Sequence, residues 1–473
     1  MKNKIKKVSE NIYEIPKQGK MNVPIKIFAS EKILKNIEKD KTLEQAQNMA
    51  ALSGAIGSIM VLSDAHQGYG SCVGGVEAFD LEEGVVSPGQ IGYDINCSVR
   101  LLRTNLPLEM VKKKGEEIAN ILYSAVPSGV GKKGPMPLSN KELKEILKEG
   151  AQWLVNKGYG KKEDYIYTED NGRLDGAKPE NVSQRAIGRG MNQLGTLGAG
   201  NHFVEVQEII EVYDKDTADV FDLYKGQIVI MIHCGSRGLG HQTASDYILE
   251  CEKKYGIDKL PDRELVNAPI GSELGRKYLS AMAAAANFAF ANKQLITYNI
   301  RKALKNIYSD FEADVVYDIC HNIAKFEKHK INGKEMDMLI VRKGATRSFG
   351  KERKEIPLKY RKIGCPIFIP GSMGTSSYVL VGTSKAEEVS LASTAHGAGR
   401  VLSRTAAKRD LKIKDVKKNL KERGIIIKAG SEKGILEEAP EAYKDVDEVV
   451  RVSHEVGIGN LVAKMKPLIV IKG

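Results

Sequence analysis

The chain has 473 residues, of which 42% are hydrophobic and 28% are charged, and this composition is ordinary for a soluble globular protein. The length alone predicts a large core and two or three domains. The formal net charge of +12 favours a polyanionic partner, because Lys and Arg side chains that neutralise phosphates release condensed counterions. A basic surface without nucleic acid is the alternative, and charge does not distinguish RNA from DNA.

The six cysteines form no C-x-x-C pair, which argues against a disulfide framework or a zinc ribbon. Reduced thiols in a cytoplasmic protein are the simplest interpretation. The most apolar helix candidate, residues 278–292, contains Asn287 and is flanked by Lys277 and Lys293. This segment is too short and too polar to span a bilayer, so we predict no membrane partner.

Helix-like and strand-like patterns are interleaved irregularly along the chain. In chain order they predict a helix over 34–52, strands over 59–62 and 99–103, helices over 108–125 and 141–157, strands over 204–212 and 227–233, a helix over 272–307, and strands over 314–319, 337–341 and 365–370. The run 227–233 is apolar on both faces, which predicts a central buried strand. Since several strands follow each other directly, we expect an α+β fold with extensive mixed or antiparallel sheet, not a repeating βα barrel.

Two further segments are predicted to be mobile surface loops. Residues 128–137 are rich in Gly and Pro, and residues 158–178 are polar with mixed charge. We interpret both as surface excursions and not as domain boundaries.

Five of the eight histidines lie in short segments that have the pattern of strand ends or Gly-rich turns. They are His66, His202, His233, His321 and His396. Imidazole, carboxylate and thiolate groups are common metal ligands, and turns at strand ends are where a rigid scaffold displays them. One such histidine is more often structural, but several beside Gly-rich turns favour a metal-dependent enzyme that acts on phosphates.

The candidate metal ligands combine three imidazoles with a carboxylate and a thiolate placed three residues apart: Asp94, Cys97, His202, His233 and His321. These are too many ligands for one tetrahedral site that keeps positions open for substrate, so two adjacent ions with a bridging ligand fit better. A thiolate such as that of Cys97 can bridge two ions. Ligand softness alone favours Zn, Fe or Co over Mn, which leaves the metal's identity open.

Four Gly-rich turns expose backbone N–H groups that can bind phosphate oxygens. They span residues 197–202, 234–240, 370–377 and 396–399, and none has the form of a P-loop or opens a Rossmann unit. Because residues 398–408 have a helix-like pattern, His396 is predicted at a helix N-terminus, where free N–H groups would stabilise a phosphoryl group on the ring. A structural histidine fits the local sequence equally well.

Seven segments carry unusual strings of residues. They are Asp-Ala-His-Gln-Gly-Tyr-Gly at 64–70, Gly-Gly-Val-Glu-Ala-Phe-Asp at 74–80, Ser-Pro-Gly-Gln-Ile-Gly-Tyr-Asp-Ile-Asn-Cys at 87–97, Gly-Thr-Leu-Gly-Ala-Gly-Asn-His at 195–202, His-Cys-Gly-Ser-Arg-Gly-Leu-Gly-His at 233–241, Pro-Gly-Ser-Met-Gly at 370–374 and His-Gly-Ala-Gly-Arg at 396–400. These strings and their order strongly resemble the RtcB family of tRNA-splicing RNA ligases, from about residue 25 to the C-terminus.

This resemblance implies one compact α+β unit over residues 1–473, in place of the two or three domains that length suggests. It also implies a GTP-dependent enzyme that joins an RNA 3′-phosphate or 2′,3′-cyclic phosphate to an RNA 5′-hydroxyl with two Mn²⁺ ions. The RNA would be broken RNA or intron-excised tRNA halves. The need for an archease-like activating protein stays open.

The resemblance further implies roles for individual residues. The metal ions would be held by Asp94, Cys97, His202, His233 and His321, with Cys97 as the bridge, and His396 would be the nucleophile that takes GMP. The nucleotide would be contacted by Asn201, His202, Glu205, His321, Asn322, Pro370, Gly371, Ser372, Met373, Ser377, His396, Gly397, Ala398, Gly399, Tyr443 and Lys472, with Tyr443 stacked on guanine. RNA would be contacted by His66, Arg189, Arg237 and Arg404.

Two other classes of protein fit part of the pattern. A metal-dependent phosphohydrolase acting on RNA ends would use the same ions without a histidine nucleophile, and would form no protein–GMP adduct. A non-catalytic RNA-binding protein would explain the positive charge but not the convergence of metal ligands.

Overall fold

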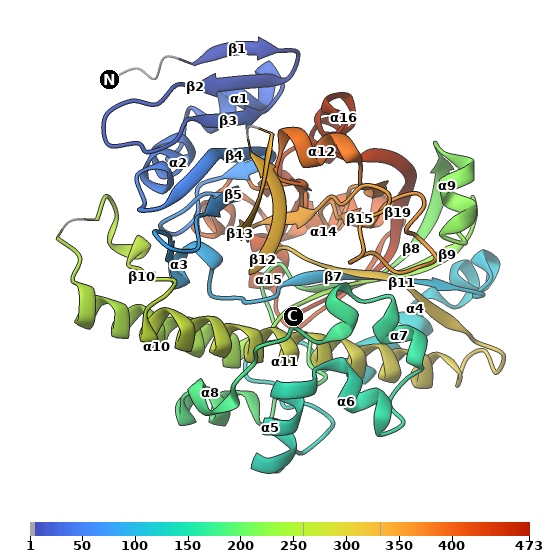
Figure 1. Ribbon diagram of the computed structural model, residues 1–473. Helices are drawn as coiled ribbons and strands as arrows, with labels where there is room; N and C mark the ends of the chain where they lie inside the picture. The colour runs from blue at the N-terminus through green and yellow to red at the C-terminus, as the bar shows by residue number, and fades with distance from the viewer. Residues whose placement is uncertain (1–4, 259, 332) are drawn as a thin grey trace.

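Two large β-sheets occupy the centre of the molecule, with helices packed around them (Figure 1). This computed structural model describes residues 5–258, 260–331 and 333–473. The first sheet has the strand order β1-β2-β3-β4-β5-β13-β12. Its strands are β1 (Lys6–Ser9), β2 (Ile12–Ile15), β3 (Ile25–Phe28), β4 (Ala55–His66), β5 (Val73–Phe79), β12 (Asn322–Ile331) and β13 (Lys334–Lys343).

The second sheet has the strand order β11-β7-β9-β8-β19-β16-β15, and β18 pairs with β19. Its strands are β7 (Ser98–Thr104), β8 (Phe203–Val212), β9 (Ile228–Cys234), β11 (Ala313–Cys320), β15 (Pro366–Ile369), β16 (Ser377–Val381), β18 (Ile426–Ala429) and β19 (Asn460–Lys472). The outer strands β11 and β15 lie close to each other, so the sheet curls towards a barrel. Two short pairs, β6 (Val85–Val86) with β10 (Ala268–Pro269) and β14 (Ala345–Arg347) with β17 (Ser393–Ala395), complete the strands.

The sheets confirm the predicted fold class. Most neighbouring strands are antiparallel, while β3 with β4 and β18 with β19 are parallel. The predicted central strand over 227–233 is β9, which is buried along its whole length between β7 and β8. The strands predicted over 59–62, 99–103, 204–212, 314–319, 337–341 and 365–370 are β4, β7, β8, β11, β13 and β15.

The longest helix, α11 (Glu273–Leu304), runs through the interior and is buried over most of its length. The other helices are α1 (Glu31–Ile37), α2 (Thr42–Ala50), α3 (Pro88–Ile91), α4 (Leu108–Ala125), α5 (Asn140–Glu149), α6 (Ala151–Asn156), α7 (Lys162–Ile166), α8 (Gln184–Gly190), α9 (Lys215–Val220), α10 (Arg237–Tyr255), α12 (Ser384–Val389), α13 (Arg404–Asp410), α14 (Ile413–Glu422), α15 (Glu432–Glu437) and α16 (Val446–Val456), with 3₁₀ turns η1 (Glu169–Gly172), η2 (Pro179–Asn181), η3 (Arg263–Leu265) and η4 (Pro440–Ala442).

Two predicted helices, over 108–125 and 272–307, are confirmed as α4 and α11, and two others are split. The segment 34–52 forms α1 and α2, because the Asp40 carboxylate accepts from the backbone N–H of Thr42 and starts a new helix there. The segment 141–157 forms α5 and α6, which meet at Gly150. Gly150 has a φ of 60°, a conformation that interrupts a right-handed helix.

The prediction of a surface loop over 158–178 is only partly right, because residues 161–163 and 175–176 are exposed but the segment is not a loop throughout. This segment contains α7 and η1 and buries Asp164 and Glu169. Its charged residues pair with charges of the core: Asp164 accepts two hydrogen bonds from Arg301, and Glu169 lies 2.6 Å from Lys325. The mixed charge that predicted solvent exposure therefore marks buried ion pairs. By contrast, the segment 128–137 lies at the surface, with residues 130–133 exposed.

The predicted placement of His396 at a helix N-terminus is also wrong. His396 directly follows β17, and the next helix, α13, begins eight residues later at Arg404. Gly399 has a φ of 72°, and the chain there turns against the backbone of Asp64 instead of continuing as a helix. The dipole of a following helix therefore does not act on this ring.

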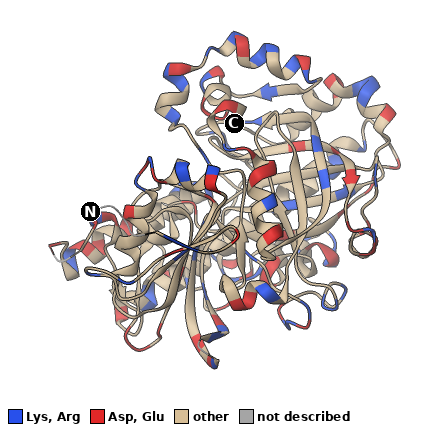
Figure 2. Ribbon diagram, turned by 90° about the horizontal axis from the view of Figure 1, so that it is seen from above, with Lys and Arg blue, Asp and Glu red and all other residues tan. Residues whose placement is uncertain are grey.

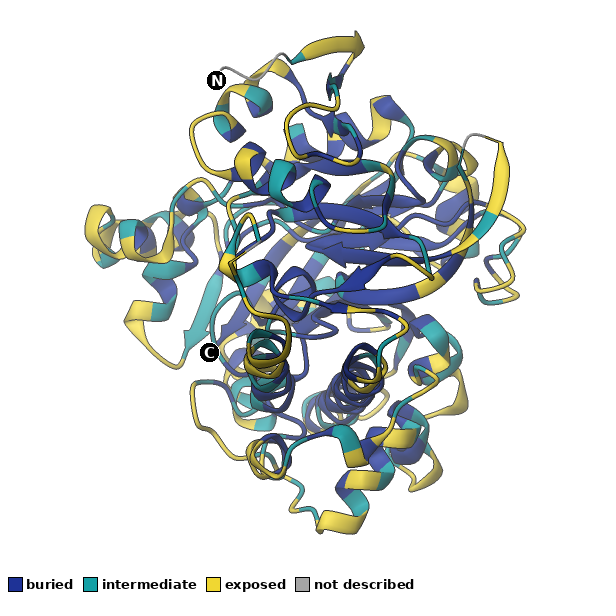
Figure 3. Ribbon diagram, turned by 60° about the vertical axis from the view of Figure 1, so that its left-hand side comes forward, coloured by how far each residue is buried: buried dark blue, intermediate teal, exposed yellow. Residues whose placement is uncertain are grey.

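The surface and the core divide along the expected lines. Buried residues concentrate on the sheets and on the inner helices, and exposed residues on the outer helices and loops (Figure 3). Lys and Arg are distributed over those outer helices, interspersed with Asp and Glu (Figure 2). All six cysteines are buried and unpaired. Within the described ranges, no helix combines the length and the apolarity needed to cross a membrane.

Candidate active site

The strand register of the second sheet gathers four predicted ligands at one end of neighbouring strands. Cys97 immediately precedes β7, His202 precedes β8, His321 follows β11, and His233 lies near the end of β9. In the sheet, Val99 and Phe203 both pair with His233, and Cys320 pairs with Ser98. Antiparallel pairing therefore brings residues that are far apart in sequence to one point.

The five predicted ligands form two groups that share one sulfur. Cys97 Sγ lies 3.1 Å from His233 Nε2, which lies 3.2 Å from His321 Nε2. On the other side, Cys97 Sγ lies 3.5 Å from His202 Nε2, which lies 2.7 Å from Asp94 Oδ2. Within each group the ligand atoms all lie within 4.8 Å of one another. We call these five residues the ligand cluster.

The donor atoms of the ligand cluster fit metal ions. The Nδ1–H of His202 donates to the backbone oxygen of Leu197 at 3.0 Å, which directs Nε2 towards Asp94 and Cys97. His233 and His321 direct Nε2 atoms at each other across 3.2 Å, where two lone pairs would repel unless a proton or an ion lay nearby. Soft sulfur and imidazole donors at this spacing suit a pair of transition-metal ions.

Burial sets the protonation of the ligand cluster. It raises the pKa of the Cys97 thiol to about 12, and the nearby Asp94 carboxylate adds to this rise. Burial also lowers the pKa of His233 and of His321 well below the usual value, so both rings are neutral at pH 7. Burial acts to raise the pKa of Asp94, but His202 outweighs it and brings that pKa to about 2. A bound cation would therefore have to displace the thiol proton of Cys97.

His396 faces the ligand cluster and is oriented by Asp64. The His396 ring centroid lies 4.7 Å from that of His321. Asp64 Oδ2 accepts from His396 Nδ1 at 2.6 Å and from the His396 backbone N–H at 3.0 Å. Because a carboxylate can only accept, Nδ1 carries the proton and Nε2 keeps its lone pair. The sequence analysis did not assign a role to Asp64, although it stands at the start of a quoted motif.

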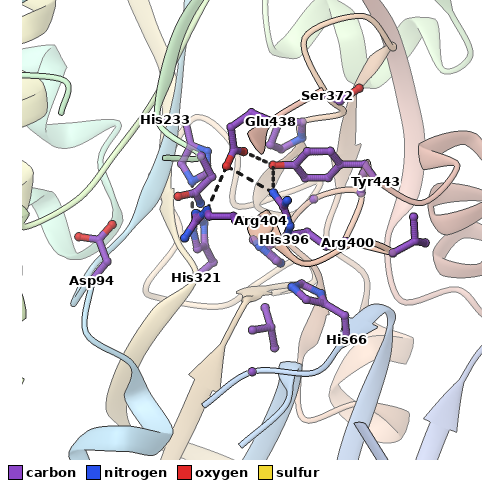
Figure 4. Close-up of a pocket in the computed structure, with 18 of the residues that line it drawn as sticks. His66, Asp94, His233, His321, Ser372, His396, Arg400, Arg404, Glu438 and Tyr443 are labelled. Atoms are coloured by element: carbon purple, nitrogen blue, oxygen red, sulfur yellow. Dashed lines mark hydrogen bonds and ion pairs between the residues drawn. The ribbon is translucent and has the colours of Figure 1, made fainter. Parts of the chain in front are cut away.

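A cavity of about 660 Å³ opens beside His396. Most of the predicted nucleotide residues line it, namely Asn201, Glu205, His321, Asn322, Pro370, Gly371, Ser372, Met373, His396, Gly397, Ala398, Gly399, Tyr443 and Lys472, and so do His66, Asp94, His233 and Arg404. Figure 4 places Asp94 on one side of the histidines and Ser372 and Tyr443 on the other. The cavity therefore joins the side of Asp94, His233 and His321 to a part that is lined by Ser372, Tyr443 and Lys472. We call this second part the recess, and it is large enough for a nucleotide.

The C-terminal strand contributes to the deepest part of this recess. Lys472 is buried in β19, pairs with Phe203 in the register, and donates from Nζ to the Gly200 backbone oxygen at 2.9 Å. Glu205, two residues further along β8, accepts from Gln207 at 2.6 Å. Burial raises the pKa of Glu205 to about 7, against the opposing effects of Gln207 and Lys472. This carboxylate can therefore exchange a proton when a ligand arrives near neutral pH.

Glu438, which the sequence analysis missed, organises the rest of the recess. Its carboxylate accepts from the Tyr443 hydroxyl and from Arg400 and Arg404, and it lies 3.9 Å from Lys472 Nζ. The Arg400 guanidinium also lies over the Tyr443 ring, 5.0 Å from its centroid. Glu438 follows directly on α15 and stands in an acidic pair, so no local pattern distinguishes it from a solvated residue.

The turn 370–377 is held open by side-chain hydroxyls. Thr375 Oγ1 accepts from the Ser372 backbone N–H at 2.7 Å, and Ser377 Oγ accepts from the Gly371 backbone N–H at 3.2 Å. Ser377 is buried behind the turn and does not line the cavity.

Asn322 ties the turn of Asp94 to the rest of the site, because its Nδ2 donates to the Asp94 backbone oxygen at 3.2 Å.

The four predicted RNA contacts lie at different distances from the cavity. His66 and Arg404 line it, and His66 Nδ1 lies 3.1 Å from the Asp64 backbone oxygen. Arg237 starts α10 and donates to Thr196 Oγ1 at 3.3 Å, outside the cavity lining. Arg189, in α8, also lies outside the lining and donates to Gln242 Oε1 at 3.0 Å.

Comparison with known proteins shows which family this chain is similar to. A family model described as tRNA-splicing ligase RtcB matches residues 45–473. The chain is 50% identical to the tRNA-splicing ligase RtcB of Nanoarchaeum equitans and 48% identical to that of Thermococcus kodakarensis, with 99% of each chain covered. It is also 46% identical to the RNA-splicing ligase RtcB homolog 1 of Entamoeba histolytica, over 91% of this chain and 83% of the relative.

Proposed function

This chain belongs to the RtcB family, and we propose that it is an RNA ligase of tRNA splicing or RNA repair. In this proposal it joins an RNA 3′-phosphate or 2′,3′-cyclic phosphate to an RNA 5′-hydroxyl, with GTP as the energy source and two Mn²⁺ ions. The relatives are named as tRNA-splicing ligases, and their full-length match to this chain supports the coarser part of the proposal.

The observation that carries the finer part is the position of His396. Its Nδ1–H is held by the buried Asp64, and its ring stands between the ligand cluster and the nucleotide-sized recess. A phosphohydrolase built on the same ligands would not need a further histidine, outside the ligand cluster, that is oriented in this way. Such a ring is suited to nucleophilic catalysis, because its free nitrogen faces the space where a phosphate would bind.

The reaction begins with GTP in the recess. The His396 Nε2 lone pair attacks the α-phosphorus, the bond to the β-phosphate oxygen breaks, and pyrophosphate leaves. The product is a histidine–GMP phosphoramidate, whose positive charge on the ring is balanced through Nδ1–H by Asp64. Asp64 thus fixes the ring during attack and does not itself need to take a proton.

Two transfers to RNA follow. A 2′,3′-cyclic end is first opened by water to a 3′-phosphate. An oxygen of the 3′-phosphate then attacks the guanylate phosphorus and displaces His396, which gives an RNA end activated as RNA–ppG. Finally the 5′-hydroxyl oxygen attacks the RNA 3′-phosphorus, loses its proton and expels GMP, so a 3′,5′-phosphodiester is formed.

The ligand cluster would hold the metal ions, and Cys97 belongs to both of its groups of ligand atoms. Bound ions would supply Lewis-acid stabilisation of the phosphate charge that develops in each transfer. The chain's own contribution is to keep the His233 and His321 rings buried and neutral at pH 7, so that both can offer a nitrogen lone pair to a cation.

Selection of guanine would come from the recess. The Glu205 carboxylate can accept from the N1–H and N2–H₂ groups of guanine, and Lys472 can donate to its O6 or N7 acceptors. Adenine reverses the polarity at N1 and at position 6, and sites built on buried polar pairs discriminate by factors of roughly 10⁴ or more in favourable cases. Tyr443, whose hydroxyl donates to Glu438, would stack on the base.

The substrates in this proposal are intron-excised tRNA halves or broken RNAs, and an archease-like activating protein is a further partner. The chain would act as one unit, because its main core extends from Tyr13 to Met465 across both sheets.

A ligation assay tests the function directly. Two RNA oligonucleotides, one with a 3′-phosphate and one with a 5′-hydroxyl, are incubated with the protein, GTP and Mn²⁺, and joined product is expected. Joining should stop when GTP is replaced by ATP. Removal of the terminal phosphate without joining would instead indicate the phosphohydrolase.

A further inference from the structure

Three aromatic rings form a continuous row at the mouth of the cavity, and no step above uses them. Tyr69 and Tyr93 line the cavity, with ring centroids 6.4 Å apart in an edge-to-face arrangement. Tyr93 is stacked on His241, with centroids 4.8 Å apart and an interplanar angle of 26°. We call these three residues the aromatic row. Its outer member, Tyr69, is 67% exposed and therefore offers a free ring to a ligand.

The aromatic row is held rigidly from below. Lys343 Nζ donates to the backbone oxygen of Tyr69 at 2.6 Å and to that of Gly89 at 3.0 Å. Gly89 belongs to α3, directly before the turn that carries Tyr93. Burial lowers the pKa of Lys343 to about 8. The loop of Tyr69 is thus fixed to the turn of Tyr93 before any ligand binds.

A cation lies beside the inner end of the aromatic row. Arg189 donates to Gln242, the residue that follows His241 in α10. Burial and, after it, the charge of Arg189 hold the pKa of His241 below its usual value, so this ring is uncharged at pH 7. Aromatic rings for bases next to a cation for the backbone are the combination that binds single-stranded nucleic acid.

The position of the aromatic row relates it to the reacting ends. Tyr93 precedes the cluster residue Asp94, and Asp94 lies on the side of the histidines away from Ser372 and Tyr443 (Figure 4). With the nucleotide in the recess on that far side, RNA has to approach His396 from the side of Asp94. An RNA end that enters there passes the exposed ring of Tyr69.

We propose that the aromatic row stacks the nucleobase of a terminal RNA nucleotide, with Tyr69 as the contacting ring and Tyr93 and His241 as its support. The choice of RNA as the ligand rests on the proposed function. Stacking on an aromatic side chain tolerates any base, so this contact would position an end without selecting its sequence.

Binding of single-stranded RNA, measured without ligation, tests the proposal. Fluorescence anisotropy gives the Kd of two labelled oligonucleotides, one ending in a 3′-phosphate and one beginning with a 5′-hydroxyl. Tyr69→Leu should raise the Kd of at least one of them roughly 5- to 100-fold, the range expected for one stacked base. Tyr69→Phe keeps the ring and should match the wild type. Tyr224→Leu, which removes an exposed tyrosine outside the cavity lining, is the matched control.

An abasic terminal nucleotide identifies the strand. For the oligonucleotide that stacks, removing its terminal base should weaken binding to the wild type but not to Tyr69→Leu. Unchanged Kd values for Tyr69→Leu with both oligonucleotides, at an unchanged melting temperature, would overturn the proposal, as would failure of the wild type to bind either one. A protein that shows the stacking effect but joins no RNA would contradict the ligase function and leave the aromatic row as an RNA contact.

Discussion

Two buried polar clusters of this molecule differ in how completely their charges are matched. The first, which we call the ionic cluster, comprises Glu169, Asp170, Lys325, Glu327, Arg342 and Arg347. Its three carboxylates and three cations are all in contact: Arg342 holds Glu327 through two hydrogen bonds of 2.6 and 2.9 Å, and Arg347 donates to the same carboxylate at 2.8 Å. This network leaves little for a ligand to satisfy.

The second is the ligand cluster, which lies as deep but is incompletely matched. His233 and His321 meet through their Nε2 atoms, of which only one can donate to the other, and among the described residues His321 Nδ1 is buried without a hydrogen-bond partner. A buried polar group left in this state costs about 1–3 kcal/mol. The comparison teaches that saturated buried charges hold the fold together, while unsaturated ones mark the place where a ligand completes the structure.

The largest change is expected when the His396 ring is removed. His396→Ala should abolish the protein–GMP adduct completely, because alanine has no nitrogen to form the phosphoramidate. Metal content and melting temperature should stay at the wild-type values, since His396 belongs to neither cluster. Labelling with α-³²P GTP and metal analysis measure both, and His454→Ala, an exposed histidine of α16, is the control. Full labelling of His396→Ala would exclude it as the nucleophile.

The next largest effect is a loss of stability when a charge of the ionic cluster is removed. Glu327→Gln removes the negative charge that the buried Arg342 and Arg347 share, and breaking such a pair costs about 3–5 kcal/mol. We expect the free energy of unfolding, measured with urea, to fall by this amount. Adduct formation per folded molecule should not change. If stability were kept and adduct formation lost, the ionic cluster would be part of the active site.

Cys97→Ser should weaken metal binding and leave stability almost unchanged, which is the opposite of what we expect for Glu327→Gln. A serine hydroxyl is a poor bridging ligand. Even the loss of a group that only hydrogen-bonds to a metal ligand lowers metal affinity by about 10- to 100-fold. We therefore expect metal affinity to fall by about 100-fold or more, with adduct formation falling in parallel and with little change in metal-free stability. Cys251→Ser, a buried thiol of α10, is the matched control. Unchanged metal stoichiometry in Cys97→Ser would make this thiol structural.

The smallest effect is a pH dependence in the recess. Burial raises the pKa of Glu205 to about 7, so below that pH the free protein carries a protonated Glu205 that must lose its proton to accept from guanine. GTP affinity should therefore fall by up to about tenfold per pH unit below pH 7, and should level off above it. Glu205→Gln should bind GTP more weakly than the wild type at pH 8, and its GTP affinity should not fall in this way below pH 7. Parallel slopes for the two proteins would show that Glu205 does not contact the base.

Periodic patterns predicted the fold where a single face or a fully buried run decided the structure. Strand β9 and helices α4 and α11 are examples. The predictions failed where a local feature competed with the period, as at Gly150, or where tertiary partners reversed the meaning of polarity, as at Glu169. A segment of mixed charge predicts solvent exposure when it is considered alone. Its opposite charges can lie far away in the sequence, and no local pattern predicts that the fold brings them together.

The site was predictable to a similar degree. Chemistry and spacing singled out Asp94 and Cys97, and the family resemblance named a wider set, of which most members line the cavity but some, such as Ser377, Arg189 and Arg237, do not. Glu438 and Lys343 were missed, because both act through contacts with backbone or side chains that are distant in sequence, such as Arg400 for Glu438 and Tyr69 for Lys343. The helix expected after His396 was wrong because Gly399 turns the chain away.

The most direct test of the account is the location of the GMP adduct. The protein is incubated with GTP and Mn²⁺, denatured under alkaline conditions that preserve a phosphoramidate, digested and analysed by mass spectrometry. We predict one added GMP on the peptide that contains His396, and its loss in mild acid. No adduct, or an adduct on a lysine with His396 unmodified, would contradict the central claim.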